Sequence, residues 1–256
     1  MIKRNESQNM KLVMKNVGAI MLLSTLITPS VYAAVSLDRT RVVYEGDKKS
    51  LSLNISNDNK ALPYLAQSWV EDAQGNKINS PLTVLPPVQR IEPGAKSQVK
   101  IQGLAAINSL PQDRESLFYF NLREIPPVSD KPNTLQIALQ TRIKMFYRPA
   151  AILKDLETWP QKITLTKVGD RFQLNNPTAF FITIVDASRT VKGDSITGFE
   201  PIMVEPQSHA IFKTSASAFG NSPVLTYIND YGARPKVQFN CSGSSCQVAT
   251  ITDRGE

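Results

Sequence analysis

Alternating apolar and polar residues recur along this chain in short runs, and residues typical of turns close most of them. Residues 51–55 (LSLNI) alternate as a half-buried strand does, and residues 118–122 (FYFNL) are rich in strand-forming aromatic side chains. The longest run, 135–147, keeps its apolar residues on one parity. Turn signals rich in Gly, Pro, Asn and Asp occupy 45–47, 56–59, 74–76 and 92–94. No long run with helical periodicity follows residue 33, so the pattern predicts an all-β fold.

The strand pattern is interrupted once, which divides the chain into two sets of strands. Residues 149–161 contain two prolines and no clear strand, so we expect a linker near 149–158. A second series of short runs follows at 163–165, 172–174, 180–185, 202–204, 210–212, 224–228, 237–241 and 248–251. Seven or eight short strands per half predict two tandem immunoglobulin-like β-sandwiches, at 34–150 and 151–256.

Residues 1–33 have the pattern of a secretory signal peptide. Four bases precede an apolar run from Val17 to Ile27, and the run is followed by Pro29 and a small-residue ending at Ala33. Met10 is an alternative start of translation. The apolar run is short for a bilayer span and no stop-transfer charges follow it, which disfavours a membrane anchor. We therefore expect cleavage before Ala34 and no later membrane insertion.

Composition and motifs argue against an enzyme and against a nucleic-acid-binding protein. The net charge of +7 falls to +4 without the leader, and no Lys/Arg cluster marks a nucleic-acid surface. One histidine, His209, leaves little scope for acid–base catalysis, and nucleophile-elbow, phosphate-loop and dinucleotide motifs are absent from the sequence. We expect no cofactor and no metal ion.

Cys241 and Cys246 are the two cysteines of the chain, and they lie five residues apart. Export to an oxidising compartment favours a disulfide between them. A redox-active pair is disfavoured, since the spacing is not Cys-x-x-Cys. The disulfide is expected to staple a hairpin or the end of a strand.

Two basic residues near predicted strands are candidates for binding. Arg41 lies at the start of the first strand pair, and Lys144 lies near the end of the long apolar run. Without further information such residues are ordinarily solvated surface charges, and a lysine near a strand end also protects an edge.

Five ordered segments together resemble the family of periplasmic pilus (fimbrial) chaperones. The most specific is the 17-residue run LPQDRESLFYFNLREIP at 110–126. The others are 35–41, 86–96, 135–149 and 227–232. The resemblance covers the whole chain after the leader, is weaker around 186–222, and implies two immunoglobulin-like domains in an L shape with a cleft between them. It also implies a periplasmic protein.

The resemblance implies an activity without catalysis. Such chaperones bind pilus subunits, pilins and adhesins, by lending a β-strand (donor strand complementation), and they deliver these subunits to an outer-membrane usher for pilus assembly. The lending strand matches the run beginning at Leu135, and Leu135, Ile137 and Leu139 are expected to fill the subunit's groove. From the pattern alone, these three side chains would instead pack in the protein's own core. The free protein could also self-associate through this strand.

Further site residues are implied by the same resemblance. Arg41 and Lys144 match the pair that binds the subunit's C-terminal carboxylate. Glu115, Arg148 and Asp230 match an interdomain charge network, although the residues themselves are equally compatible with three independent surface charges. Lys144 has the opposite parity to Leu135, Ile137 and Leu139, so the two roles require a twist, a bulge or a cleft on the other face of the strand.

Two other classes of protein remain open from the sequence. A structural pilus subunit or secreted sandwich adhesin would be a single incomplete domain with a donor extension at its N-terminus, whereas two full strand sets follow residue 33 here. A secreted sugar-active enzyme would need paired catalytic carboxylates in a cleft, and the sequence offers no candidate pair.

Overall fold

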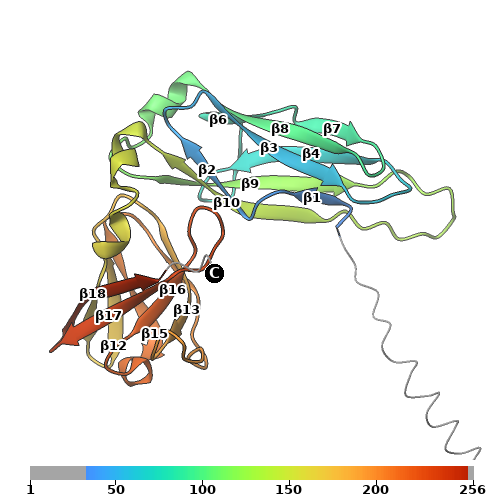
Figure 1. Cartoon of the computed structure of the whole chain (residues 1–256). Helices are drawn as coiled ribbons and strands as arrows, with labels where there is room; N and C mark the ends of the chain where they lie inside the picture. Colours follow the sequence, from blue (N-terminus) through green and yellow to red (C-terminus); the bar gives the residue numbers. More distant parts are fainter. Residues whose placement is uncertain (1–32, 253–256) are drawn as a thin grey trace, which may run out of the picture. The chain divides into compact units, whose positions relative to one another are not determined.

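The computed structural model describes residues 33–252, so the expected signal peptide lies almost entirely outside the described residues. Within that range the chain forms eighteen β-strands, and its helical segments are four short 3₁₀ turns. The strands fall into two sets that follow each other along the chain (Figure 1). No helix between residues 33 and 252 is long and apolar enough to cross a membrane.

The first set comprises ten strands in two sheets. One sheet has the order β1-β3-β8-β6, and the other has the order β2-β10-β9-β4-β5, with β7 also paired to β4. The strands are β1 (Val35–Leu37), β2 (Arg41–Glu45), β3 (Ser50–Asn57), β4 (Tyr64–Glu71), β5 (Lys77–Ile78), β6 (Leu82–Leu85), β7 (Val88–Ile91), β8 (Lys96–Gly103), β9 (Ser116–Ile125) and β10 (Gln140–Arg148).

Period-two burial explains how these sheets enclose a core. In β3, Leu53 and Ile55 are buried while Ser52 and Asn54 are exposed, so one face of the strand carries the apolar residues. The turn before β8 has Pro93 and Gly94 at its centre, and Ala95 N–H donates to the Glu92 carbonyl at 3.0 Å. Gly94 has φ +67°, the conformation that the third position of a type II turn requires.

The second set forms one continuous sheet of eight strands in the order β14-β13-β16-β17-β18-β11-β12-β15. Val204 of β14 and Phe212 of β15 belong to one core, although their strands end the order on opposite sides. The sheet therefore curls around a single core, as a sandwich does. The strands are β11 (Thr164–Val168), β12 (Arg171–Asn176), β13 (Ile182–Ser188), β14 (Ile202–Val204), β15 (Ser208–Ser215), β16 (Val224–Tyr227), β17 (Lys236–Ser242) and β18 (Ser245–Thr252).

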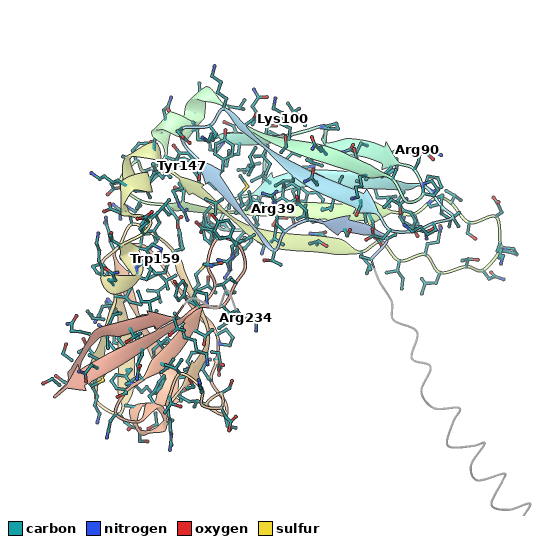
Figure 2. The ribbon with its side chains drawn as sticks, viewed as in Figure 1. Arg39, Arg90, Lys100, Tyr147, Trp159 and Arg234 are labelled. Carbon is teal, nitrogen blue, oxygen red and sulfur yellow. A yellow bond between two sulfur atoms is a disulfide. The ribbon has the colours of Figure 1, made fainter. Side chains whose placement is uncertain are left out.

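The segment between the two sets carries no strand, as the sequence predicts. It contains two 3₁₀ turns, η2 (Ala150–Asp155) and η3 (Trp159–Gln161). Trp159 is labelled in Figure 2. Its ring packs on two aromatic rings of the second set, with centroids 6.2 Å from Phe180 and 5.2 Å from Tyr227. The other 3₁₀ turns are η1 (Ala105–Ser109) and η4 (Ala216–Phe219).

The cysteine prediction is confirmed. Cys241 and Cys246 form a disulfide and lie opposite each other across the hairpin of β17 and β18. Because the hairpin turn lies between the two cysteines, the disulfide links the end of β17 to the start of β18.

Candidate functional site

The first half of β10 is an open sheet edge. β9 pairs with β10 over 140–147, but on the other side β2 pairs with it, in parallel, only over 144–148. The preceding strand β1 pairs with β3 in the opposite sheet, because the chain changes sheets at residues 38–40. Within the described part of the chain, residues 140–143 of β10 therefore have no strand neighbour on that side. An unpaired edge of this kind can accept another strand.

An exposed apolar segment leads into that edge. Leu135, Ile137 and Leu139 are 85%, 64% and 38% exposed, and none belongs to the core of the first set. The alternative that they pack into the protein's own core is thus wrong. Spaced apolar side chains left in water are typical of a surface that binds a partner.

The prediction of one strand from residue 135 to 147 is wrong for its first five residues. β10 begins at Gln140, and residues 135–139 are irregular. Isolated hydrogen bonds, and not a ladder, tie this segment to its surroundings. The Leu139 carbonyl accepts Glu124 N–H at 3.0 Å, and the Gln136 side chain donates to the Pro127 carbonyl. Alternating sequence gives this segment a strand's pattern, but β9 ends at Ile125, so most of the segment has no adjacent strand among residues 33–252 with which to form a ladder.

Arg41 and Lys144 occupy the point where β2 begins to cover β10. They are register partners in the parallel pairing, and both are half-buried. Burial lowers the pKa of Lys144, and the charge of Arg41 lowers it further. Burial also lowers the pKa of Arg41, although Asp230 and Glu115 act in the opposite direction. Two adjacent cations in a partly desolvated place favour the binding of an anion.

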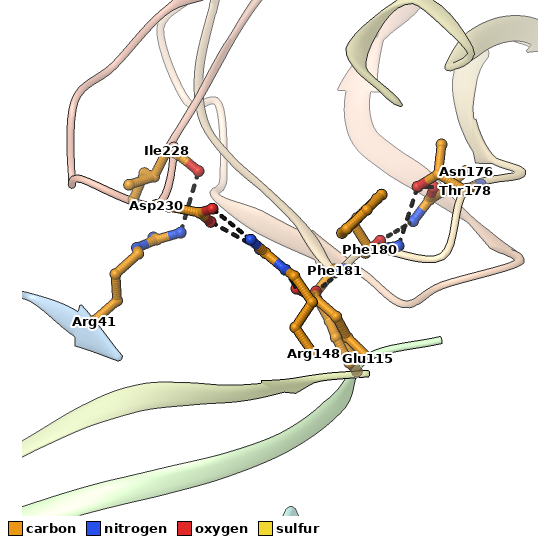
Figure 3. Close-up of polar contacts among 9 residues, drawn as sticks. All are labelled: Arg41, Glu115, Arg148, Asn176, Thr178, Phe180, Phe181, Ile228 and Asp230. Carbon is orange, nitrogen blue, oxygen red and sulfur yellow. Dashed lines mark hydrogen bonds and ion pairs between the residues drawn. The ribbon is translucent and has the colours of Figure 1, made fainter. Parts of the chain in front are cut away.

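Neither cation is neutralised by an ion pair among residues 33–252. Arg41 donates from Nη1 to the Ile228 carbonyl at 3.1 Å, while its Nε is buried without a hydrogen-bond partner in the described part of the chain (Figure 3). Lys144 forms no hydrogen bond or ion pair with any described residue. The pair therefore retains donors for a group that is not part of the chain.

The parity of Lys144 is explained by the two faces of β10. Met145 and Tyr147 are buried in the core of the first set, so the odd-numbered residues of this strand face inward. Lys144 has the other parity and points away from the core, beside Tyr119 of β9. If residues 135–139 continued the strand, their apolar side chains would lie on the core side. The two groups of residues would then act from opposite faces of one strand.

Glu115, Arg148 and Asp230 meet in one charge network. Arg148 Nε donates to Glu115 at 2.7 Å, and its two terminal nitrogens donate to Asp230 at 2.6 and 2.9 Å (Figure 3). Glu115 precedes β9, Arg148 ends β10, and Asp230 lies beyond β16, so the network joins the two sets of strands. Glu115 and Arg148 are each 4% exposed.

The network also holds the backbone of the second set. The second oxygen of Glu115 accepts Phe181 N–H at 2.8 Å, and the guanidinium of Arg148 lies 5.2 Å from the centre of the Phe180 ring. Burial raises the pKa of Glu115 more than Arg148 and the Phe181 N–H lower it. Three independent surface charges, the alternative open from the sequence, would not share these bonds.

A tight loop after β16 completes the site, and Asp230 is the one residue of this loop for which the sequence predicts a role. The side chain of Asn229 accepts the N–H groups of Tyr231 and Ala233 at 3.1 and 2.9 Å, which fixes the loop. Gly232 has φ +83° and lies so near the first set that a Cβ there would be 2.8 Å from Thr40 Oγ1. Tyr231 is 95% exposed and shares a hollow with Arg41.

Comparison with known proteins assigns this architecture to a protein family. The family model described as "Pili and flagellar-assembly chaperone, PapD N-terminal domain" matches residues 34–153, and "Pili assembly chaperone PapD, C-terminal domain" matches residues 158–239. The chain belongs to the PapD-like family of pilus assembly chaperones. This assignment decides against a structural pilus subunit and against a sugar-active enzyme.

Individual relatives of this chaperone cover nearly its whole length. It is 53% identical over 218 residues to "Chaperone protein PapD" of Escherichia coli, a match covering 84% of this chain and 90% of the relative. It is 52% identical over 229 residues to "Probable fimbrial chaperone YfcS" of Escherichia coli (strain K12), covering 89% and 90%.

A solved structure of a related complex is also similar. "Salmonella enterica SafA pilin in complex with the SafB chaperone" contains a chain 26% identical to this one, with a TM-score of 0.66 and coverage of 81% of this chain and 95% of that one. That title describes a chaperone of this fold bound to a pilin.

Proposed function

We propose that this chaperone captures pilus subunits in the periplasm by adding residues 135–143 to the subunit as a β-strand. The observation that carries the proposal is the exposed apolar row of Leu135, Ile137 and Leu139, which runs directly into the open edge of β10. Main-chain pairing along the edge supplies affinity, and alternate side chains entering a groove supply specificity.

The proposed capture explains why an apolar row stays in water. A subunit that lacks one strand exposes its own core and an unpaired backbone edge, and both would otherwise promote aggregation. Leu135, Ile137 and Leu139 lie two residues apart, so in an extended strand they project to one side. Their burial in the subunit removes apolar surface of both proteins from water, at about 25 cal/mol for each Å².

Arg41 and Lys144 are proposed to bind the C-terminal carboxylate of the subunit. They are adjacent in register and partly desolvated, and neither forms an ion pair with a described residue. A carboxylate can accept hydrogen bonds from both, and arginine can bind it through two nitrogens. Fixing the end of the subunit chain at Lys144 would set which residue of β10 faces which groove position.

Glu115, Arg148 and Asp230 are proposed to hold the loop at 228–232 beside this anchor. Arg148 binds Asp230, and two residues earlier the Ile228 carbonyl accepts Arg41. The network would thereby orient the Arg41 guanidinium toward the incoming carboxylate. The same chaperone is proposed to pass its subunit to the outer-membrane usher.

Co-expression with subunits from the same operon tests the proposal. A one-to-one complex is expected from size-exclusion chromatography of the periplasmic extract. Ile137→Asp should reduce the yield of complex strongly, because a charge would be buried in an apolar groove. Val128→Asp is the matched control, since Val128 is also an exposed apolar residue near this segment but lies outside 135–143. Equal yields from the Ile137 variant and the wild type would contradict strand addition by this segment.

A further inference from the structure

Glu124 is a carboxylate in a position that the pattern of β9 reserves for the core. The residues of β9 with its parity are Phe118, Phe120 and Leu122, all buried. Glu124 continues that row and is 5% exposed. Carboxylates are almost never this buried unless a cation or several hydrogen bonds compensate for the lost hydration.

The partner that the structure gives this carboxylate is a single neutral group. Glu124 Oε2 accepts the backbone N–H of Val35 at 2.8 Å. Val35 begins β1 in the opposite sheet, so this bond spans the sandwich. Among residues 33–252 no Lys, Arg or His forms an ion pair with Glu124.

The residue before Val35 is held in place as well. Ala34 is buried, and its carbonyl accepts Asp58 N–H at 2.7 Å. Consecutive Cα atoms lie 3.8 Å apart, so the nitrogen of Ala34 is one residue away from a nitrogen that already touches the carboxylate. Ala34 is also the first residue after the expected leader.

We propose that Glu124 is the binding site for the α-ammonium group that leader removal creates on Ala34. The inference rests on cleavage before Ala34 and is independent of subunit capture. Hydrolysis of the 33–34 peptide bond consumes one water and leaves a carboxylate on residue 33 and an ammonium on residue 34. A neutral amide with one N–H thereby becomes a cation with three, beside a buried anion that has no other cationic partner in the described chain.

The consequence is that the first sandwich is completed by processing. Before cleavage, the one group among residues 33–252 that compensates the buried charge of Glu124 is the backbone N–H of Val35. After cleavage, an ion pair joins the residue that precedes β1, in one sheet, to β9 of the other sheet. Hydrogen bonds link two acidic residues to this terminus: Glu124 of β9 accepts Val35 N–H, and Asp58, in the turn after β3, donates its backbone N–H to the Ala34 carbonyl. Asp58 is exposed, and its carboxylate already accepts Ser56 Oγ.

The test compares a protein that begins at Ala34 with one that carries Gly-Ser before Ala34. Each is made with Glu124 and with Glu124→Gln, which keeps an acceptor for Val35 N–H. The pKa of the α-amino group is measured by NMR, and the urea midpoint of unfolding is measured against pH. In the protein that begins at Ala34, the α-amino pKa should lie at least one unit above its ordinary value of about 8.

The expected stability effect has a definite sign. A base whose pKa is raised in the folded protein contributes stability that is complete below its unfolded pKa and is lost as pH rises through its folded pKa. The Gly-Ser extension should therefore lower the urea midpoint at pH 6 when Glu124 is present and have little effect when Gln is present. Asp58→Asn should leave the α-amino pKa raised.

Several results would overturn the proposal. One is an α-amino pKa of ordinary value in the protein that begins at Ala34. Another is an equal loss of stability from the extension in the Glu124 protein and in the Glu124→Gln variant. A third is a measured mass that does not correspond to an exported protein beginning at Ala34. If Glu124→Gln fails to fold, the two Glu124 proteins still decide the question, since their α-amino pKa values should differ.

Discussion

Arg41 and Lys144 face each other across the parallel strands β2 and β10, and neither forms an ion pair with a described residue. Like charges held side by side destabilise a protein unless an anion joins them. The pairing therefore has an energetic cost in the free chaperone that the proposed bound carboxylate would offset. The first two predictions depend on this relationship.

A subunit peptide with a free C-terminal carboxylate should bind more tightly than the same peptide with an amide end. Each charge-assisted hydrogen bond contributes about 1.5–3 kcal/mol, so the ratio of dissociation constants should be about tenfold or more. Lys144→Met should weaken binding of the acid and reduce its advantage over the amide. Lys100→Met is the control, because Lys100 is an exposed lysine of β8 in the opposite sheet. Equal affinities of acid and amide for the wild type would refute the carboxylate anchor. Isothermal titration calorimetry provides the affinities.

Binding of that peptide should weaken as pH rises through the lowered pKa of Lys144, because the neutral amine loses its attraction for the carboxylate. The stability of the free protein should change with pH in the opposite direction to the affinity for the peptide. A lysine with a lowered folded pKa binds fewer protons in the native state than in the unfolded state, so stability rises with pH between the two values. Lys144→Met should abolish both dependences and stabilise the free chaperone at pH 7. Titration calorimetry and urea unfolding between pH 7 and 10.5 would measure them, and a pH-independent affinity in the wild type would contradict the assignment.

Arg148→Ala should destabilise the protein far more than Asp230→Asn does. The first change leaves the buried Glu115 without its cation, which costs about 3–5 kcal/mol. The second keeps a hydrogen-bond acceptor at a side chain that is 40% exposed, and should cost about 1 kcal/mol or less. Urea unfolding monitored by tryptophan fluorescence suits the comparison, since Trp69 lies in the first set of strands and Trp159 packs on the second. Similar losses of stability from both changes would show that the cost of burying Glu115 is not offset by its ion pair with Arg148.

Gly232→Ala should lower both stability and subunit capture. An alanine there must adopt φ +83° and place its Cβ 2.8 Å from Thr40 Oγ1, so the loop has to move. Gly169→Ala separates the two causes, because Gly169 has φ +58° with no atom within 4 Å of the added Cβ. We expect about 1–2 kcal/mol from the strained φ alone, a larger loss at Gly232, and reduced capture only at Gly232. Identical effects at the two glycines would remove the contact with Thr40 from the explanation.

The strands of the second set could be predicted well from the sequence, and those of the first set less well. Every run proposed between 163 and 251 overlaps a strand, because these strands are short, alternate clearly and end at turn residues. The sequence pattern does not indicate β4, because Ser68, Trp69 and Val70 are buried in succession and hide the period of two. Trp69 is covered by cations on the outer face, with Arg123 5.1 Å and Lys77 5.7 Å from its ring.

The site shows a sharper limit of sequence reasoning. Arg41 and Lys144 are 103 positions apart, and only the parallel pairing of β2 with β10 makes them neighbours. Periodicity within one segment carries no information about which distant segment will lie beside it. For the same reason, the alternation at 135–139 indicates a strand. In the described part of the chain, however, the change of sheets at residues 38–40 removes a neighbour on one side of that segment, and β9 ends at Ile125 on the other.

Leu135, Ile137 and Leu139 lie outside the core that keeps this chaperone folded. Most mutations to a binding strand of an ordinary sandwich would be limited by their cost to folding, because the same side chains fill the interior. If residues 135–143 are added to a subunit as proposed, binding and folding depend on different residues here. Substitutions among apolar residues at these three positions would then change which groove is filled, while the free energy of unfolding would change little. The segment is therefore the part of the chain at which a chaperone of this design can be retargeted with little risk to its own fold.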